Sequence, residues 1–176
     1  MERKGIVTIH GKAATLAGKG LKVGDKAPGF TVLDGDLKEV SLRDFAGKIK
    51  VISVTPSLDT PVCDVQARRF NSEAASLPAD VVVLNISMDL PFAITRFCTT
   101  AGIEKVKAYS DHRDGSFGTA YGVLMKETRL LARSVFIIDK DDMVRYVEIV
   151  PEVSNHPDYE KVLVALQKVT EQRKAA

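Results

Sequence analysis

The sequence predicts an α/β fold with a mixed sheet, and three observations support this. Residues 49–54 and 81–86 are near-continuous apolar runs, which are typical of strands buried in a parallel sheet. Between them, apolar side chains recur at helical spacing over residues 63–77. A hairpin pattern and an amphipathic helix close the chain. This order of strands and helices favours an α/β domain in which antiparallel strands extend a parallel core.

The N-terminal part of the chain is predicted to form two pairs of extended segments. Residues 5–18 have the pattern of a β-hairpin, with alternating side chains on either side of a glycine turn. Further along, residues 30–33 and 39–42 flank Asp34-Gly35, which is a strong turn signal between short strands.

The middle of the chain carries two helical patterns. The first places its apolar residues on one face, at Cys63, Ala67, Phe70, Ala74 and Leu77. The second opens at Pro91, because proline is tolerated in the first helical turn, and Gly102 is placed to end it. Residues 106–110 then predict a further strand, and residues 117–123 a short helix or turn.

The C-terminal part is predicted to form a second hairpin and a helix. Residues 134–138 and 144–150 are strand-like and flank an acidic turn at 139–142, which we interpret as a solvated turn and not as a cation site. Residues 158–174 have amphipathic helical spacing. No repeat or linker divides the chain, so we expect a single domain spanning residues 1–176.

Composition excludes several classes of function. The chain has 176 residues, of which 45% are hydrophobic and 27% charged, as in soluble globular proteins. Its net charge of +2 is spread over mixed signs without a basic stripe, which argues against a nucleic-acid partner. No apolar run approaches the roughly 20 residues that span a bilayer, and the charged N-terminus lacks the core of a signal peptide. We therefore expect a cytoplasmic protein without a membrane partner.

The two cysteines, Cys63 and Cys98, lie 35 residues apart. One pair is too few for a disulfide-stapled secreted scaffold, and the spacing is not that of a CxxC dithiol. The histidines are scattered, so no zinc-ligand spacing is present and we expect no metal. Two interpretations remain: two inert buried thiols, or a reactive pair whose disulfide forms and breaks.

Cys63 stands where a strand hands over to a helix. Thr60 suits the N-cap of that helix and Pro61 its first position, so Cys63 falls in the first turn. There, unpaired N–H groups and the positive end of the helix dipole favour a thiolate, which is the nucleophilic form of cysteine. The alternative is a small apolar side chain on the inner face of the helix. The combination of strand end, proline-shaped loop and capping threonine favours the reactive thiol.

The segment Pro56-x-x-x-Thr60-x-x-Cys63 also resembles the active-site motif of peroxiredoxins, and its neighbours resemble the thiol peroxidase branch of that family. Support extends along nearly the whole chain, through the runs 24–30, 96–98, 117–123 and 132–139 and the N-terminal hairpin. Two positions depart from the pattern: Gly29, where aspartate is more usual, and Ser134, where alanine often follows the arginine.

The resemblance implies a thioredoxin-like fold and a role for each matching residue. Cys63 would be the peroxidatic thiolate that attacks a hydroperoxide and becomes a sulfenic acid. Thr60 and Arg133 would hold the sulfur and the peroxide by hydrogen bonds, with Pro56 shielding the thiolate from water. Cys98 would be the resolving cysteine that forms an intrachain disulfide with Cys63.

The same resemblance implies partners and excludes others. It implies hydrogen peroxide and alkyl hydroperoxides as substrates, thioredoxin as the reductant, a homodimer, and no cofactor, because the two sulfurs carry the redox chemistry. Gln66 and Arg68 are expected at the edge of the pocket. Four further apolar residues could line the pocket or a dimer surface, but for most of them we expect packing in the core: Phe45, Phe92, Tyr121 and Leu124.

Two other functions remain open from the sequence. A general disulfide oxidoreductase would reduce protein disulfides without peroxide, and the missing CxxC argues against it. A peroxide-responsive sensor would use the same disulfide as a switch and change its affinity for a partner. It would be oxidised once per cycle without sustained turnover with thioredoxin.

Overall fold

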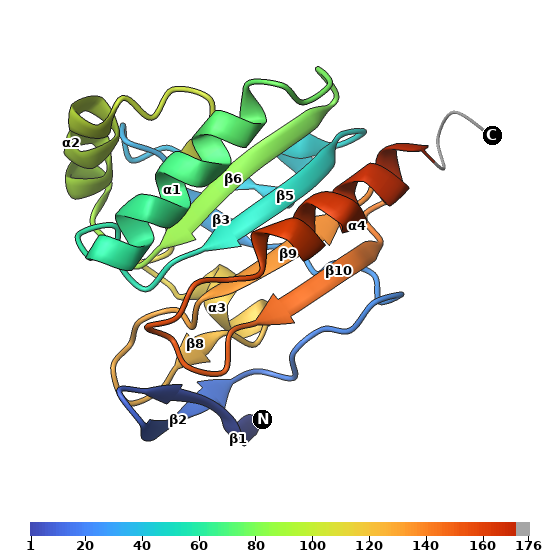
Figure 1. Cartoon of the computed structure of the whole chain (residues 1–176). Helices are drawn as coiled ribbons and strands as arrows, with labels where there is room; N and C mark the ends of the chain where they lie inside the picture. The colour runs from blue at the N-terminus through green and yellow to red at the C-terminus, as the bar shows by residue number, and fades with distance from the viewer. Residues whose placement is uncertain (172–176) are drawn as a thin grey trace.

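The computed structural model describes residues 1–171, so residues 172–174 of the predicted terminal helix lie outside the described part. Within it, a seven-stranded sheet forms the centre of the molecule, in the order β10-β9-β5-β6-β7-β3-β4 (Figure 1). Its strands are β3 (Thr31–Leu33), β4 (Glu39–Ser41), β5 (Ile49–Val54), β6 (Val81–Ser87), β7 (Lys107–Ser110), β9 (Ser134–Ile138) and β10 (Val144–Ile149).

The sheet is mixed, as predicted. Strands β5, β6 and β7 run parallel, whereas β9 pairs antiparallel with β5 and with β10. The register sets Val54, the last residue of β5, opposite Ser134, the first residue of β9. The end of β5 and the start of β9 therefore meet at one edge of the sheet.

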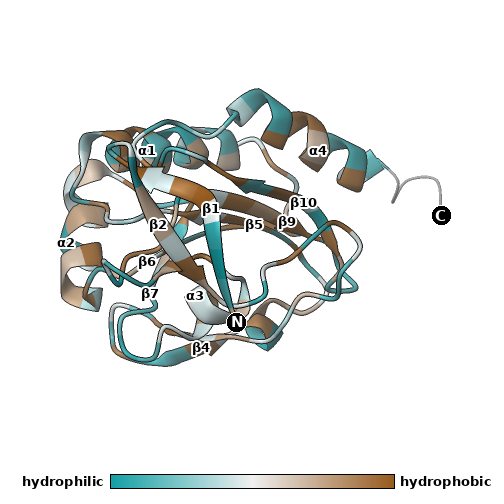
Figure 2. Cartoon of the chain, turned by 90° about the horizontal axis from the view of Figure 1, so that it is seen from below, coloured by the Kyte–Doolittle hydropathy of each residue, from teal (hydrophilic) through white to brown (hydrophobic). Residues whose placement is uncertain are grey.

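Helices cover both faces of the sheet. On one face lie α1 (Pro61–Ala74), α2 (Pro91–Ala101) and α4 (Tyr159–Glu171), whose apolar sides pack on residues of β5, β6 and β9 in one buried cluster. On the other lie α3 (Ser116–Ala120) and a short 3₁₀ helix, η1 (Leu42–Phe45), which share a second buried cluster with the N-terminal hairpin. Figure 2 shows the apolar central strands enclosed between these layers.

The N-terminal hairpin consists of β1 (Glu2–Ile9) and β2 (Lys12–Ala17) and turns through His10 and Gly11, both with positive φ. Its first strand begins three residues before the predicted start of the hairpin at residue 5. A third strand, β8 (Leu124–Met125), pairs with β2 and was not predicted, because two residues have no measurable periodicity.

The helix ends follow the local sequence. Helix α2 begins at Pro91 and ends before Gly102, whose φ of 66° is the left-handed cap expected of glycine. Helix α1 ends at Ala74, so its predicted extension to Leu77 is wrong. Gly122 has a φ of 72°, and a Cβ there would lie 2.4 Å from the backbone nitrogen of Gly20. Only glycine fits this crossing.

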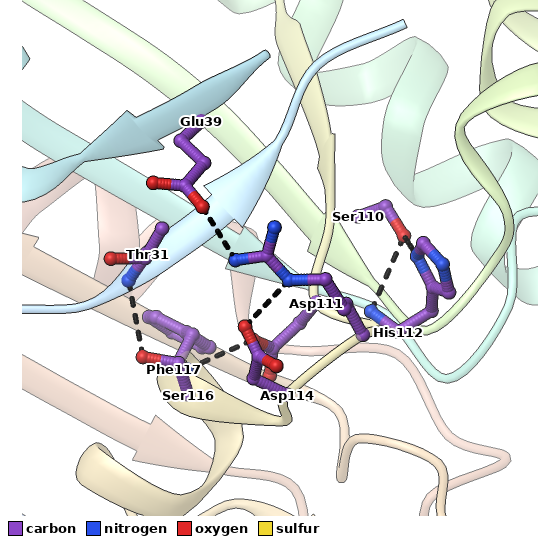
Figure 3. Close-up of polar contacts among 9 residues, drawn as sticks. Thr31, Glu39, Ser110, Asp111, His112, Asp114, Ser116 and Phe117 are labelled. Carbon is purple, nitrogen blue, oxygen red and sulfur yellow. Dashed lines mark hydrogen bonds and ion pairs between the residues drawn. The ribbon is translucent and has the colours of Figure 1, made fainter. Parts of the chain in front are cut away.

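A polar cluster at the end of β7 fixes α3 (Figure 3). Asp111 is 2% exposed, and its carboxylate accepts the backbone N–H groups of Phe117 and Gly118 at 3.0 and 2.8 Å. Burial raises the pKa of Asp111 to about 6 in spite of these bonds. Above that pH, the cluster holds a buried negative charge.

No helix among residues 1–171 is both long and apolar enough to cross a membrane.

Candidate active site

Cys63 lies in the first turn of α1, as predicted. The chain leaves β5 at Val54 and reaches the helix through Thr60, whose extended backbone (φ −129°, ψ 147°) makes it the N-cap, followed by Pro61. Cys63 is the third helical residue and is fully buried. Its sulfur is therefore held away from bulk water close to the positive end of the helix.

The hydroxyl of Thr60 does not cap the helix. It donates a 3.2 Å hydrogen bond to the carbonyl oxygen of Ser57 instead. The expectation of a capping threonine is thus correct for the backbone and wrong for the side chain. The first helical hydrogen bond runs from the Asp64 N–H to the Thr60 carbonyl, so the hydroxyl is not needed to begin the helix.

Arg133 reaches the same place from the neighbouring strand. It directly precedes Ser134, which pairs with Val54 at the end of β5. Antiparallel pairing of β5 and β9 therefore sets the start of one strand beside the end of the other. An arginine 70 residues along the chain is brought to Cys63 by this register.

The guanidinium of Arg133 is 2% exposed and makes three hydrogen bonds. Its Nε donates to the carbonyl of Val153 at 2.8 Å, and Nη1 donates to Oε1 of Gln66 at 2.6 Å. The third bond runs from Nη2 to Sγ of Cys63 at 3.3 Å. No carboxylate of the described residues pairs with this buried cation. An uncompensated buried charge is costly, so the site favours a group that can carry a negative charge next to Arg133, and the sulfur of Cys63 is in that position.

Gln66 holds Arg133 in position. It lies one turn after Cys63 on α1 and is fully buried, and its Nε2 donates to Oγ of Ser53 at 2.8 Å. That bond leaves Oε1 turned to the guanidinium. Gln66 was expected at the edge of the pocket, but it lies buried behind Arg133 and does not line the pocket. Arg68 is exposed and bonds to Asp64 and to the Ala101 carbonyl of α2, away from Arg133.

A pocket of about 400 Å³ opens beside this cluster. Pro56 and Thr60 contribute to it from the active-site loop between β5 and α1 (residues 55–60), and Arg133 contributes from just before β9. The hairpin tip contributes Ile9 and His10. The remaining wall is mostly apolar and comes from Pro61, Val62, Met125, Leu130, Val153 and Ser154. Four of the five predicted site residues, all but Cys98, thus lie in or directly behind one pocket.

Cys98 lies elsewhere. It is on α2, half-buried, and lines a second pocket of about 420 Å³ together with Val106 and Ala108 next to and on β7. Burial raises the pKa of the Cys98 thiol. Both cysteines are free thiols. The structure therefore describes the reduced arrangement, in which the two sulfurs face different neighbours.

The other candidates divide clearly. Phe45, Tyr121 and Leu124 are buried in the core as expected, whereas Phe92 is 66% exposed. Val153 and Ile9 were missed as site residues. Val153 serves through its backbone carbonyl, so its side chain carries no signal of this contact. Ile9 was predicted only as part of a hairpin, and its place in the pocket depends on tertiary packing.

Comparison with known proteins gives a consistent result. Residues 22–163 match the family model described as Redoxin. The chain is 58% identical to a thiol peroxidase of Halalkalibacterium halodurans over 159 residues, which are 90% of this chain and 95% of that one. It is 57% identical to a thiol peroxidase of Bacillus subtilis, with the same shares covered. A thiol peroxidase of Staphylococcus aureus is 52% identical over 93% of this chain and 98% of its own.

Solved structures share the fold. The crystal structure of a peroxiredoxin-like protein from Aquifex aeolicus superposes with a TM-score of 0.86 at 40% identity, covering 95% of this chain and 97% of that one. A thiol peroxidase from Chromobacterium violaceum gives 0.83 at 20% identity, covering 94% and 97%. The mixed sheet flanked by helices, with its N-terminal hairpin, is thereby confirmed as a thioredoxin-like fold.

Proposed function

The chain belongs to the Redoxin family and is a thiol-dependent peroxidase of the peroxiredoxin type, and we propose that Cys63 is the residue that reacts with the peroxide. The observation that supports this assignment most directly is the contact between its buried sulfur and the Arg133 guanidinium. The contact gives the sulfur a cationic partner that no carboxylate among the described residues neutralises.

The first step is an attack of the Cys63 thiolate on the terminal oxygen of the hydroperoxide. A sulfur–oxygen bond forms, the oxygen–oxygen bond breaks, and the departing oxygen takes a proton and leaves as water or an alcohol. Arg133, which donates to the sulfur, would also donate to the peroxide oxygens, and the hydroxyl of Thr60, which lines the same pocket, would turn toward them. Pro56 covers the loop side of the pocket.

The size of the rate enhancement shows why the thiolate alone is not enough. A free cysteine of pKa about 8.5 is roughly 3% thiolate at pH 7, so full ionisation gains at most ~30-fold. That corresponds to about 2 kcal/mol, whereas enzymes lower barriers by upwards of ~8 kcal/mol. The larger share must come from aligning the peroxide and stabilising charge on the departing oxygen. We assign both tasks to Arg133.

The second step joins the two cysteines. The Cys98 sulfur attacks the Cys63 sulfenic acid, a disulfide forms, and the oxygen leaves as water. Cys63 contacts Arg133, which directly precedes β9, whereas Cys98 lies against β7. Strands β5 and β6 lie between β9 and β7, so β9 and β7 are roughly 14 Å apart. A disulfide needs Cα atoms within about 7 Å. One or both helix ends must therefore unravel locally before the bond forms.

The proposal extends to substrates and partners. The apolar wall of the pocket suits alkyl hydroperoxides beside hydrogen peroxide. Thioredoxin is the proposed reductant of the Cys63–Cys98 disulfide, and we propose a cytoplasmic homodimer in which each subunit keeps its own disulfide. Residues 1–176 act as one domain in this account.

Intact mass after a single equivalent of hydrogen peroxide tests the assignment. We expect wild-type protein to lose two hydrogens, as the disulfide forms, and Cys98→Ser to gain one oxygen. Cys63→Ser keeps its mass. If Cys63→Ser is oxidised as fast as wild type, or Cys98→Ser gains no oxygen, the assigned roles are wrong.

A further inference from the structure

Asp89 ties the active-site loop to the rest of the fold. It lies in the connection between β6 and α2, and its carboxylate accepts three short hydrogen bonds. Ser57 Oγ donates at 2.6 Å and the backbone N–H of Leu58 at 2.7 Å, both from the loop that leads to Cys63. Ser87 Oγ, at the end of β6, donates at 2.7 Å. One carboxylate thus joins the loop before α1 to the loop before α2.

The backbone of Asp89 is fixed independently of its side chain. Its carbonyl accepts a hydrogen bond from the Ser110 hydroxyl at the end of β7. The same hydroxyl oxygen lies 2.8 Å from Nδ1 of His112 (Figure 3). A hydroxyl has one proton, so Nδ1 of His112 must supply the other. The backbone that carries the carboxylate is therefore anchored to the end of β7.

The contact with Ser57 continues to the start of α1. The Ser57 carbonyl accepts the hydrogen bond of the Thr60 hydroxyl, and Ser57 Oγ accepts the Asp59 N–H at 3.2 Å. The side chain of Leu58 is 3% exposed and belongs to the buried cluster against which Cys98 packs. Releasing Asp89 therefore frees the segment that positions Thr60 and the first turn of α1.

Space for that release is present next to Asp89. A pocket of about 310 Å³ separates the loop residues Ser57, Leu58 and Asp59 from α2. On the α2 side it is lined by Ala93, Arg96, Phe97 and Thr100, and Phe97 immediately precedes Cys98. The cavity lies between the two elements that must approach each other when the disulfide forms.

We propose that Asp89 is a positioning residue that holds the Ser57–Leu58 segment closed during the peroxide reaction and whose release limits disulfide formation. This inference rests on the proposed function of Cys63 and Cys98. With the carboxylate in place, Thr60 and the first turn of α1 stay aligned with Arg133, and the sulfenic acid waits longer for Cys98. While it waits, a second peroxide can add another oxygen to give a sulfinic acid and water or an alcohol.

The test measures how the Cys63 sulfenic acid divides between disulfide and sulfinic acid. Asp89→Asn removes the charge, and Ser57→Ala removes one of the two loop contacts while leaving the Leu58 N–H bond. Each variant is treated with rising hydrogen peroxide together with excess reductant, and intact mass gives the sulfinic fraction per turnover. Asp36→Asn, an exposed charge change, and Leu166→Ala, a buried truncation on α4, are the controls.

We expect Asp89→Asn to need at least about fivefold more peroxide than wild type for the same sulfinic fraction, and Ser57→Ala to shift in the same direction by less. The first reaction with peroxide slows by several-fold in Asp89→Asn. Amide exchange over residues 57–66 accelerates in both variants. Asp36→Asn keeps the wild-type sulfinic fraction, peroxide rate and amide exchange. Leu166→Ala, although less stable, keeps the wild-type ratio of disulfide to sulfinic acid.

Other outcomes overturn the inference. Asp89 does not control disulfide formation if the sulfinic fraction is unchanged in Asp89→Asn and Ser57→Ala, or if it increases. The same conclusion follows if Leu166→Ala shows an equal shift. Failure of the proposed function is distinguishable, because wild-type protein itself would then form neither the disulfide nor the sulfinic acid at Cys63.

Discussion

The guanidinium of Arg133 donates a 3.3 Å hydrogen bond to the sulfur of Cys63, and both groups are buried. Its other two bonds go to neutral acceptors, the Val153 carbonyl and the Gln66 amide. Among the described residues, the Cys63 sulfur is therefore the one hydrogen-bond partner of Arg133 that can carry a negative charge. The reactivity of the site should therefore depend on the position of the guanidinium as much as on its charge.

Replacing Arg133 with alanine should lower the second-order rate with hydrogen peroxide by roughly a hundredfold or more, because alignment and charge stabilisation are lost together. The thiolate fraction accounts for at most ~30-fold of this loss. Single-turnover kinetics and the ultraviolet titration of the thiolate, measured on the same variant, separate the two effects. A rate loss equal to the change in thiolate fraction would contradict the assignment of Arg133.

Replacing Gln66 with glutamate should weaken the site by giving Arg133 a carboxylate partner. The guanidinium would pair with that carboxylate, so the sulfur would hold its negative charge less readily and the peroxide rate should fall by about tenfold or more. Gln66→Leu, which has similar volume but no charge, is the matched control and should lose less. Equal rates in wild type and Gln66→Glu would show that the sulfur does not depend on the unpaired cation.

Glu152 should influence selectivity through the hairpin. Its carboxylate accepts the backbone N–H groups of His10 and Gly11 at 3.0 Å each and the Thr8 hydroxyl at 2.8 Å. Hydrogen bonds from the Ser154 hydroxyl, the Gly11 N–H and the Thr8 hydroxyl hold the pKa of Glu152 well below the usual range. Glu152→Ala should loosen the tip that brings Ile9 to the pocket. We expect kcat/KM to fall several-fold for a bulky alkyl hydroperoxide and little for hydrogen peroxide. Equal losses for both substrates would exclude a role of the hairpin in selectivity.

Asp111 should make stability depend on pH in an unusual direction. Its pKa is raised to about 6 in the folded chain, so between the unfolded pKa of about 4 and pH 6 the folded state binds more protons. Its contribution is therefore greatest below about pH 4 and is lost as the pH rises through about 6. At 1.36 kcal/mol for each pH unit, the loss reaches at most about 3 kcal/mol.

The comparison of wild type with Asp111→Asn isolates this contribution from the other carboxylates. The free energy of unfolding of wild type, measured against that of the variant, should decrease between about pH 4 and pH 7. Denaturant unfolding at several pH values gives the difference directly. A difference that stays constant, or increases with pH, would show that the carboxylate is already ionised at low pH.

The sequence predicts the elements whose patterns are long. Strands β5 and β6 and helices α1 and α2 follow from apolar runs and proline or glycine ends. Strand β8 does not, because Leu124 and Met125 pair with β2 only after the chain has folded. The end of α1 was placed three residues late because Leu77 continues the apolar spacing outside the helix and still packs on the core.

The site was predicted unevenly for a similar reason. Local signals around Thr60 and Pro61 place Cys63 in a first helical turn. Arg133 entered only through the family resemblance, because its proximity depends on the register between β5 and β9. Asp89 gave no signal, since its partners are a serine, a backbone N–H and a second serine from two other segments.

The most direct test of the account is peroxide consumption coupled to thioredoxin, thioredoxin reductase and NADPH, with wild type, Cys63→Ser and Cys98→Ser compared. The account predicts sustained turnover by wild type, none by Cys63→Ser, and a single reaction with peroxide by Cys98→Ser. Wild-type protein that is oxidised once and then stalls with thioredoxin would contradict thioredoxin-dependent turnover and favour a peroxide-responsive sensor. Turnover that survives in Cys63→Ser would contradict the central assignment.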